Sequence, residues 1–127
     1  RREIVEIYNS SFRACPNVTV PFELHKCRSN FHLYVLLIDF ENAGISRNAF
    51  MTTLLENGMQ TQVHYIPVHT QPYFRKQWGT EWGDCPNAEQ YYSSCLSLPL
   101  YPAMTDKDVE KVISVVKSLA EEGRYDH

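Results

Sequence analysis

The sequence predicts an α/β or α+β domain in which a small β-sheet is covered by helices. The chain of 127 residues has the size of one ordinary domain. Apolar residues at helical spacing alternate along the chain with short apolar runs that are typical of strands. The composition, 43% hydrophobic and 21% charged, is that of a globular protein. No repeat or flexible linker divides the chain, so we expect one domain.

The first half of the chain is predicted to form a helix, a strand and a second helix. Residues 1–12 have helical periodicity, and residues 31–40 are an almost continuous apolar run that predicts a strand buried on both faces. A short extended stretch at 18–21 precedes that strand. Ser46 is a good N-cap and a glycine follows at 58, so a helix is expected at 46–57. The apolar face of the first helix is predicted to contain Ile4, Ile7 or Tyr8, and Ser11 or Phe12.

The second half is predicted to add two strands around an irregular segment. Alternating polar and apolar residues predict a strand at 60–66 with a polar face that is a candidate for function. Aromatic residues, glycine and proline dominate 69–86, which predicts short helical turns joined by loops. A helix at 88–94 and a short strand at 96–100 follow, and Pro99 confines that strand to a sheet edge or a strand end.

The last predicted helix has both of its ends marked in the sequence. Thr105 is a good N-cap, and Gly123 closes the helical pattern. The spacing of the apolar residues between them predicts that this helix covers the sheet. The expected stripe consists of Val109, Val112, Ile113, Val116 and Leu119.

Charge and composition argue against several classes of partner. Twelve basic and fifteen acidic side chains give a net charge of −3 without a basic stripe, so no nucleic-acid partner is expected. The longest apolar run, residues 33–38, is far shorter than the roughly 20 residues that span a bilayer, and nothing resembles a signal peptide. We therefore expect no membrane partner and a cytoplasmic location. Four cysteines without a CxxC pair predict free thiols.

The densest group of reactive side chains lies between residues 63 and 75. Arg75 suits a phosphate or carboxylate, His64 and His69 suit sugar hydroxyls, and Tyr73 suits stacking. Together with Tyr65 these residues form a candidate site for a polar, anionic ligand at the end of a predicted strand. The residues alone leave a second interpretation open, in which the histidines and tyrosines are hydrogen-bonded packing residues.

Metal binding and thiol catalysis have less support in the sequence. His64 and His69 lack a helical spacing and a third ligand, so no metal site is expected. Cys85 or Cys95 could pair with His69, but no local pattern indicates a lowered thiol pKa.

Four segments carry a recognisable pattern. Residues 58–73 read GMQTQVHYIPVHTQPY, and the other three segments are 1–4 (RREI), 31–35 (FHLYV) and 97–105 (SLPLYPAMT). In order and spacing, over nearly the whole chain, these segments resemble the C-terminal part of the DegT/DnrJ/StrS sugar aminotransferases.

The resemblance implies the C-terminal small domain of a fold-type I transferase that depends on pyridoxal phosphate, with a mostly antiparallel sheet covered by helices. Residues 1–127 would form this domain and residues 1–14 its connecting helix. The large domain, with the lysine that holds the cofactor, would precede Arg1, and a chain that opens inside a helix without an N-cap agrees with a fragment. We therefore expect no catalytic residue in this chain and no activity from it alone. The lysines without a family motif are Lys26, Lys76, Lys107, Lys111 and Lys117.

The implied reaction moves an amino group from glutamate to a nucleotide-linked keto-deoxysugar. The amino-acid sequence of residues 64–73 is most similar to the branch of the family that aminates a UDP-linked 4-keto-6-deoxy-N-acetylhexosamine. The family usually works as a homodimer. The resemblance implies the substrate-side residues His64, Tyr65, His69, Tyr73 and Arg75, whereas Phe31 and Tyr34 are expected in the core.

Three alternatives stay open at this point. Some relatives replace the lysine by histidine and dehydrate the sugar, which only the large domain decides. The chain could instead be a binding module without catalysis. It could also be a domain whose histidines and tyrosines are purely structural.

Overall fold

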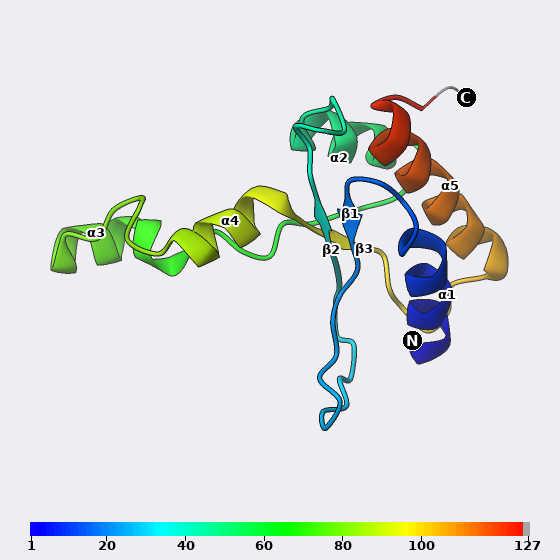
Figure 1. The fold of residues 1–127 in the computed structure, drawn as a ribbon, viewed down its shortest axis with the longest axis horizontal. Coiled ribbons are helices and arrows are strands. Elements are labelled where there is room, and N and C mark those ends of the chain that lie inside the picture. Colours follow the sequence, from blue (N-terminus) through cyan, green and yellow to red (C-terminus); the bar gives the residue numbers. More distant parts are fainter. Residues whose placement is uncertain (126–127) are drawn as a thin grey trace.

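The computed structural model describes residues 1–125 and has two parts. We call the first the body: it contains the three-stranded sheet and helices α1 (Arg2–Phe12), α2 (Arg47–Glu56) and α5 (Asp106–Glu122). The second, which we call the arm, comprises residues 63–94 and projects away from the body (Figure 1). The arm carries the 3₁₀ turn η1 (Val68–Thr70) and helices α3 (Pro72–Trp78) and α4 (Pro86–Ser94).

The sheet is antiparallel, as expected, with the strand order β1-β2-β3. Its strands are β1 (Val18–Thr19), β2 (Tyr34–Ile38) and β3 (Cys95–Leu98). The predicted helices, the extended stretch at 18–21 and the last strand are present within a few residues of their expected bounds. Pro99 directly follows β3, which confirms that this proline marks a strand end.

The predicted strand at 60–66 is wrong. Only Gln62 pairs with the sheet, through hydrogen bonds from Gln62 N–H to Ser97 O and from Ser97 N–H to Gln62 O at 3.2 and 2.8 Å. Beyond Gln62 the chain leaves β3 and enters the arm (Figure 1). The burial does not follow the predicted alternation either, since Tyr65 and its neighbour Ile66 are both exposed. A strand also needs a neighbour along its whole length.

The predicted strand at 31–40 is shorter than expected and less evenly buried. β2 begins at Tyr34, and Phe31 lies outside it with a left-handed φ of 46°. Tyr34, Leu36 and Ile38 are buried on one face of β2, while the residues between them are only half-buried. β2 therefore has one fully covered face, instead of the two that its apolar run predicted, whereas all four residues of β3 are buried.

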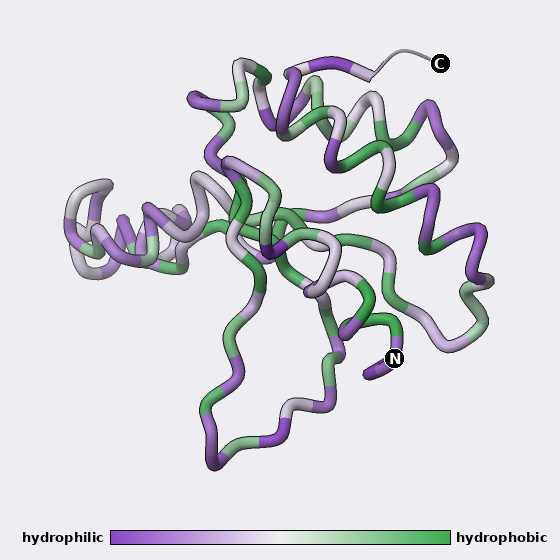
Figure 2. The backbone as a smooth tube through the Cα atoms, turned by 45° about the vertical axis from the view of Figure 1, so that its right-hand side comes forward, coloured by the Kyte–Doolittle hydropathy of each residue, from purple (hydrophilic) through white to green (hydrophobic). Residues whose placement is uncertain are grey.

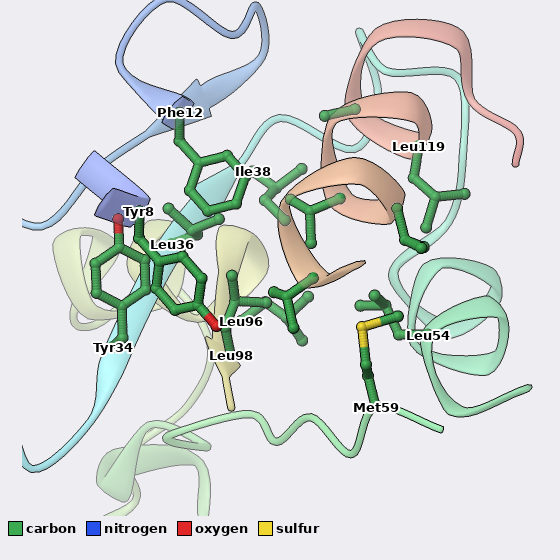
Figure 3. Packing of buried hydrophobic residues seen from close by; sticks show 14 of the residues in the cluster. Tyr8, Phe12, Tyr34, Leu36, Ile38, Leu54, Met59, Leu96, Leu98 and Leu119 are labelled. Carbon is green, nitrogen blue, oxygen red and sulfur yellow. The ribbon is translucent and has the colours of Figure 1, made fainter. Parts of the chain in front are cut away.

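The covered face of the sheet packs against helices α1, α2 and α5 around one hydrophobic core (Figure 3). The phenol of Tyr8 donates to the carbonyl of Pro99 at 3.0 Å, and the phenol of Tyr34 donates to Asn9 Oδ1 at 2.8 Å. Burial raises the pKa of both phenols, so they stay neutral donors. The expectation that Phe31 and Tyr34 are core residues is confirmed.

The buried face of α1 differs from the predicted one. Val5, Tyr8 and Phe12 are buried, whereas Ile4 is half-buried and 45% of Ile7 is exposed. The prediction allowed Tyr8 and Phe12 but missed Val5. Residues three and four apart share a face, so neighbouring faces of one helix satisfy the same spacing, and only the position of the sheet decides between them.

Local signals fix the ends of two helices of the body as predicted. Ser46 accepts the N–H of Ala49 and caps α2. Thr105 and Asp108 form a reciprocal capping box at the start of α5, and Gly123 ends α5 with a left-handed φ of 67°. The residues that α5 buries are Val109, Val112, Val115, Val116, Leu119 and Ala120. Ile113, predicted in the stripe, is half-buried.

Two segments extend beyond the packed core. The connection between β1 and β2, at about residues 20–33, forms a long excursion from the sheet, and the arm forms a second one (Figures 1 and 2). Several large apolar side chains on them are exposed, among them Phe22, Trp78 and Trp82. Among residues 1–125, no helix has both the length and the apolar character needed to cross a membrane.

Candidate functional site

His64 lies at the base of the arm, next to the sheet. The pairing of Gln62 with Ser97 brings it there, and His64 Nδ1 is 2.8 Å from the Ser97 hydroxyl oxygen. The side chain of His64 is half-buried, whereas Ser97 is 4% exposed. One ring nitrogen of His64 is therefore fixed to the sheet, and Nε2 is the ring nitrogen left for a ligand.

Tyr65 follows His64 across a cis peptide bond and is exposed over 64% of its surface. Ile66 and Val68, at 49% and 53% exposure, continue the open surface along the arm. An exposed phenol beside apolar side chains can stack on a ring and share a hydrogen bond at its polar end.

His69 lies inside the arm, in a different environment from His64. Its Nε2 is 2.7 Å from Glu89 Oε1, and the two side chains are only 10% and 7% exposed. The hydroxyl of Thr80 donates to the carbonyl of His69 at 2.6 Å. The pair links η1 to α4 across 20 residues of sequence, so one nitrogen of His69 serves the internal structure of the arm.

Glu89 is the centre of this polar interior. Besides the ring of His69, its Oε1 accepts the N–H of Gly83 at 2.6 Å and the N–H of Cys85 at 3.5 Å. Burial by itself raises the pKa of this carboxyl, but the hydrogen bonds from Gly83, His69 and Cys85 outweigh it and hold the pKa below its ordinary value. Glu89 is therefore ionised and accepts only, so Nε2 of His69 carries a proton.

Tyr73 and Arg75 lie on α3, in the outer part of the arm. Tyr73 packs with Phe74 and Trp78, with ring centroids 5.4 and 5.8 Å from its own, and is 61% exposed. Arg75 is exposed and makes no ion pair within residues 1–125, so its guanidinium is open to an anion. A shallow recess beside it is lined by Pro72, Arg75, Lys76, Gly79, Thr80 and Glu81.

The five predicted site residues do not form one cluster among residues 1–125. His64 is bound to β3, His69 is bound inside the arm, and Tyr65 lies between them in sequence on the exposed surface. Tyr73 and Arg75 stand apart from the histidines, on α3. The arrangement presents polar and aromatic groups along the arm, with His64 at its base.

Two residues that bind these histidines were not singled out from the sequence. Ser97 appeared only within the last predicted strand and the matched segment 97–105, and Glu89 only as part of a predicted helix. The pairing of residue 62 with residue 97 would have pointed to Ser97, but no local pattern reports that pairing. Glu89 has no signal in the sequence, because its donors come from separate turns of the arm.

Comparison with known proteins shows the family of this chain. Residues 1–117 match the model of the DegT/DnrJ/EryC1/StrS aminotransferase family. Over 120 residues the chain is 44% identical to the spore coat polysaccharide biosynthesis protein SpsC of Bacillus subtilis strain 168, which covers 94% of this chain and 31% of SpsC.

Solved structures agree with the sequence comparison. The aminotransferase TlmJ from Streptoalloteichus hindustanus superposes with a TM-score of 0.77 at 30% identity, over 92% of this chain and 30% of TlmJ. DesI, solved in the presence of its TDP-sugar product, gives a TM-score of 0.84 at 26% identity, over 97% of this chain and 31% of DesI. The chain thus spans about a third of the length of these relatives. By its match over residues 1–117, the chain belongs to the DegT/DnrJ/EryC1/StrS aminotransferase family.

Proposed function

We propose that this chain is the C-terminal small domain of an aminotransferase that moves an amino group from glutamate to a nucleotide-linked keto-deoxysugar. The proposed acceptor is a UDP-linked 4-keto-6-deoxy-N-acetylhexosamine, and the product would enter a surface polysaccharide or glycan. The proposed enzyme is a cytoplasmic homodimer. Residues 1–14 would be the helix that connects the small domain to the large one.

The observation that carries this proposal is the family match, which extends over 117 residues and includes the candidate site. SpsC, the relative at 44% identity, is named for polysaccharide biosynthesis, and DesI was solved with a TDP-sugar. The first name supports a role in polysaccharide biosynthesis, and the second supports a sugar bound to a nucleotide as the substrate class.

The proposed substrate-side residues are His64, Tyr65, His69, Tyr73 and Arg75. His64 offers Nε2 to a sugar hydroxyl, since Nδ1 is held by Ser97. Tyr65 offers an exposed phenol, and the exposed guanidinium of Arg75 suits a phosphate or carboxylate. His69 offers only Nδ1, because Nε2 is bound to Glu89.

The lysines of this chain do not suit the role of cofactor holder. Four of them are exposed and Lys117, on α5, is half-buried, so none is enclosed in a site that excludes water. Pyridoxal phosphate, which supplies the electron sink for amino transfer, would be bound by residues outside residues 1–127.

The test uses the full-length protein. Absorbance reports bound pyridoxal phosphate, and mass spectrometry detects the amino sugar formed from glutamate and the UDP-linked keto-sugar. We expect His64→Gln to lower kcat/KM for the keto-sugar about tenfold or more, because an unsatisfied polar group costs about 1–3 kcal/mol and 1.4 kcal/mol is a factor of ten.

The matched control is His25→Gln, since His25 is exposed in the connection between β1 and β2. It should retain wild-type kinetics. A full-length protein that binds no cofactor would contradict the proposal. A protein that binds the cofactor but releases a dehydrated sugar would replace the aminotransferase by the dehydratase.

A further inference from the structure

We propose that Ser97 is a positioning residue that holds the imidazole of His64 through Nδ1 and leaves Nε2 to exchange a hydrogen bond with a hydroxyl of the sugar substrate. This inference rests on the proposed function. It adds to it a residue of the sheet that acts on the substrate only through His64.

Ser97 is well placed to fix another side chain, because its backbone is held from both sides. On one side it pairs with Val35 of β2, and on the other it exchanges hydrogen bonds with Gln62. Its side chain is buried, with 4% of the residue exposed, so the hydroxyl has few rotamers and little water around it. The His64 ring, 2.8 Å from this hydroxyl, is therefore anchored to a buried strand of the sheet.

The chemistry of the partner distinguishes His64 from His69. The Ser97 hydroxyl donates to Nδ1 when Nδ1 carries a lone pair and accepts from Nδ1 when it carries a proton. The Glu89 carboxylate only accepts, so it requires a proton on Nε2 of His69. His64 can thus gain, lose or reverse a hydrogen bond at Nε2 without losing its anchor, whereas His69 is held in one state at its anchored nitrogen.

This difference suits two different tasks. A substrate hydroxyl can donate or accept, so a ring that is to answer it in either role has to keep its place in both tautomers. His64 and Ser97 meet this requirement. The pair of His69 and Glu89 instead keeps η1 and α4 together.

The experiment is a double-mutant cycle in the full-length enzyme. Ser97→Ala, His64→Gln and the double variant are assayed separately for amino transfer from glutamate and for amino transfer to the UDP-linked keto-sugar. We expect Ser97→Ala to lower kcat/KM for the keto-sugar about tenfold and to leave the glutamate step and the bound cofactor unchanged. In the His64→Gln background, Ser97→Ala should have no further effect, because both changes break one interaction.

Two further variants keep the test decisive. Ser97→Thr retains the hydroxyl and should recover most of the activity, whereas Ser97→Cys retains the volume without a strong hydrogen bond and should behave as Ser97→Ala. Ser94→Ala is the control, since the Ser94 hydroxyl bonds only within α4, to the carbonyls of Gln90 and Tyr91.

Three outcomes would overturn the positioning role: wild-type kinetics of Ser97→Ala, equal losses in both half-reactions, or additive losses in the double variant. Failure of the proposed function is a separate result, since the wild-type enzyme would then form no amino sugar at all. If Ser97→Ala folds poorly, the kinetics of Ser97→Cys are compared with those of Ser97→Thr, and that comparison decides.

Discussion

Glu89 is a carboxylate with almost no contact with water, and the groups around it decide its charge. Three donors, from Gly83, His69 and Cys85, converge on one of its oxygens. Their hydrogen bonds outweigh the effect of burial, so the pKa lies below the ordinary value of 4.5. A carboxylate with a lowered pKa in the folded state binds fewer protons than in the unfolded state. It therefore stabilises the fold above pH 4.5, and this stabilisation is lost as the pH falls through the lowered pKa.

Glu89→Gln is expected to lower the thermal stability of the 127-residue chain at neutral pH, because a neutral amide is a weaker acceptor for three donors. The difference between wild type and variant should shrink as the pH falls below 4.5, since the wild-type carboxyl then becomes protonated. Thermal unfolding over a series of pH values measures both effects.

The control for this experiment is Glu81→Gln, whose side chain is exposed on the loop after α3 and makes no ion pair within residues 1–125. It should not change the dependence of stability on pH. A constant difference between wild type and Glu89→Gln at all pH values would show that the charge of Glu89 is not what holds the arm.

At the scale of elements, the ends of α5 show how a local signal and a distant contact combine. Thr105 and Asp108 cap the first turn by reciprocal hydrogen bonds, which needs no other part of the chain. Gly123 ends the helix in a left-handed conformation, which is a local preference as well. A Cβ at residue 123, however, would lie 2.8 Å from the carbonyl oxygen of Ala43, in the loop before α2. Glycine at this position is therefore required by conformation and by close packing.

Gly123→Ala should destabilise the chain more than Gly58→Ala. Both glycines have positive φ, 67° and 79°, and a left-handed alanine costs about 1–2 kcal/mol. Only the first substitution also meets backbone atoms, since a Cβ at Gly58 has nothing within 4 Å. Urea unfolding of the two variants gives the comparison, and equal losses of free energy would mean that the loop before α2 moves away freely.

The whole molecule divides into a body with a hydrophobic core and an arm without one. Helices α1, α2 and α5 and the sheet bury large side chains together, with Tyr8, Tyr34 and Leu54 among them (Figure 3). The helices of the arm bury one residue, Glu89, and expose most of their aromatic side chains. Burial of apolar surface is the main favourable term in folding. Because the arm buries less apolar surface than the body, it is stabilised less.

Hydrogen exchange in the 127-residue chain should show this division. Backbone amides of α3 are expected to exchange through local opening, well before those of β2, which exchange only when the body unfolds. Mass spectrometry of peptides from residues 72–78 and 34–38 makes the measurement. Equal protection of both segments would indicate that the arm and the body unfold as one unit.

Much of the fold could be predicted because its signals are local. Ser46, Thr105 and Gly123 mark helix ends through bonds within a few residues, and the structure confirms all three. The order of the helices was also predicted, and the family resemblance implied the antiparallel sheet. The strand at 60–66 was wrong because the alternation of side chains is a local pattern, whereas pairing depends on a partner that lies 35 residues away at Ser97.

The sequence by itself determined the family, the order of the helices and the side chains that gather in residues 63–75. The tertiary structure decided which task each of these side chains can perform. His64 contacts Ser97 across 33 residues of sequence, and His69 contacts Glu89 across 20. No local sequence pattern predicts either pairing. A hydrogen bond between such residues exists only once the sheet and the arm have formed. The partner's chemistry, hydroxyl or carboxylate, then separates two histidines that look equivalent in the sequence.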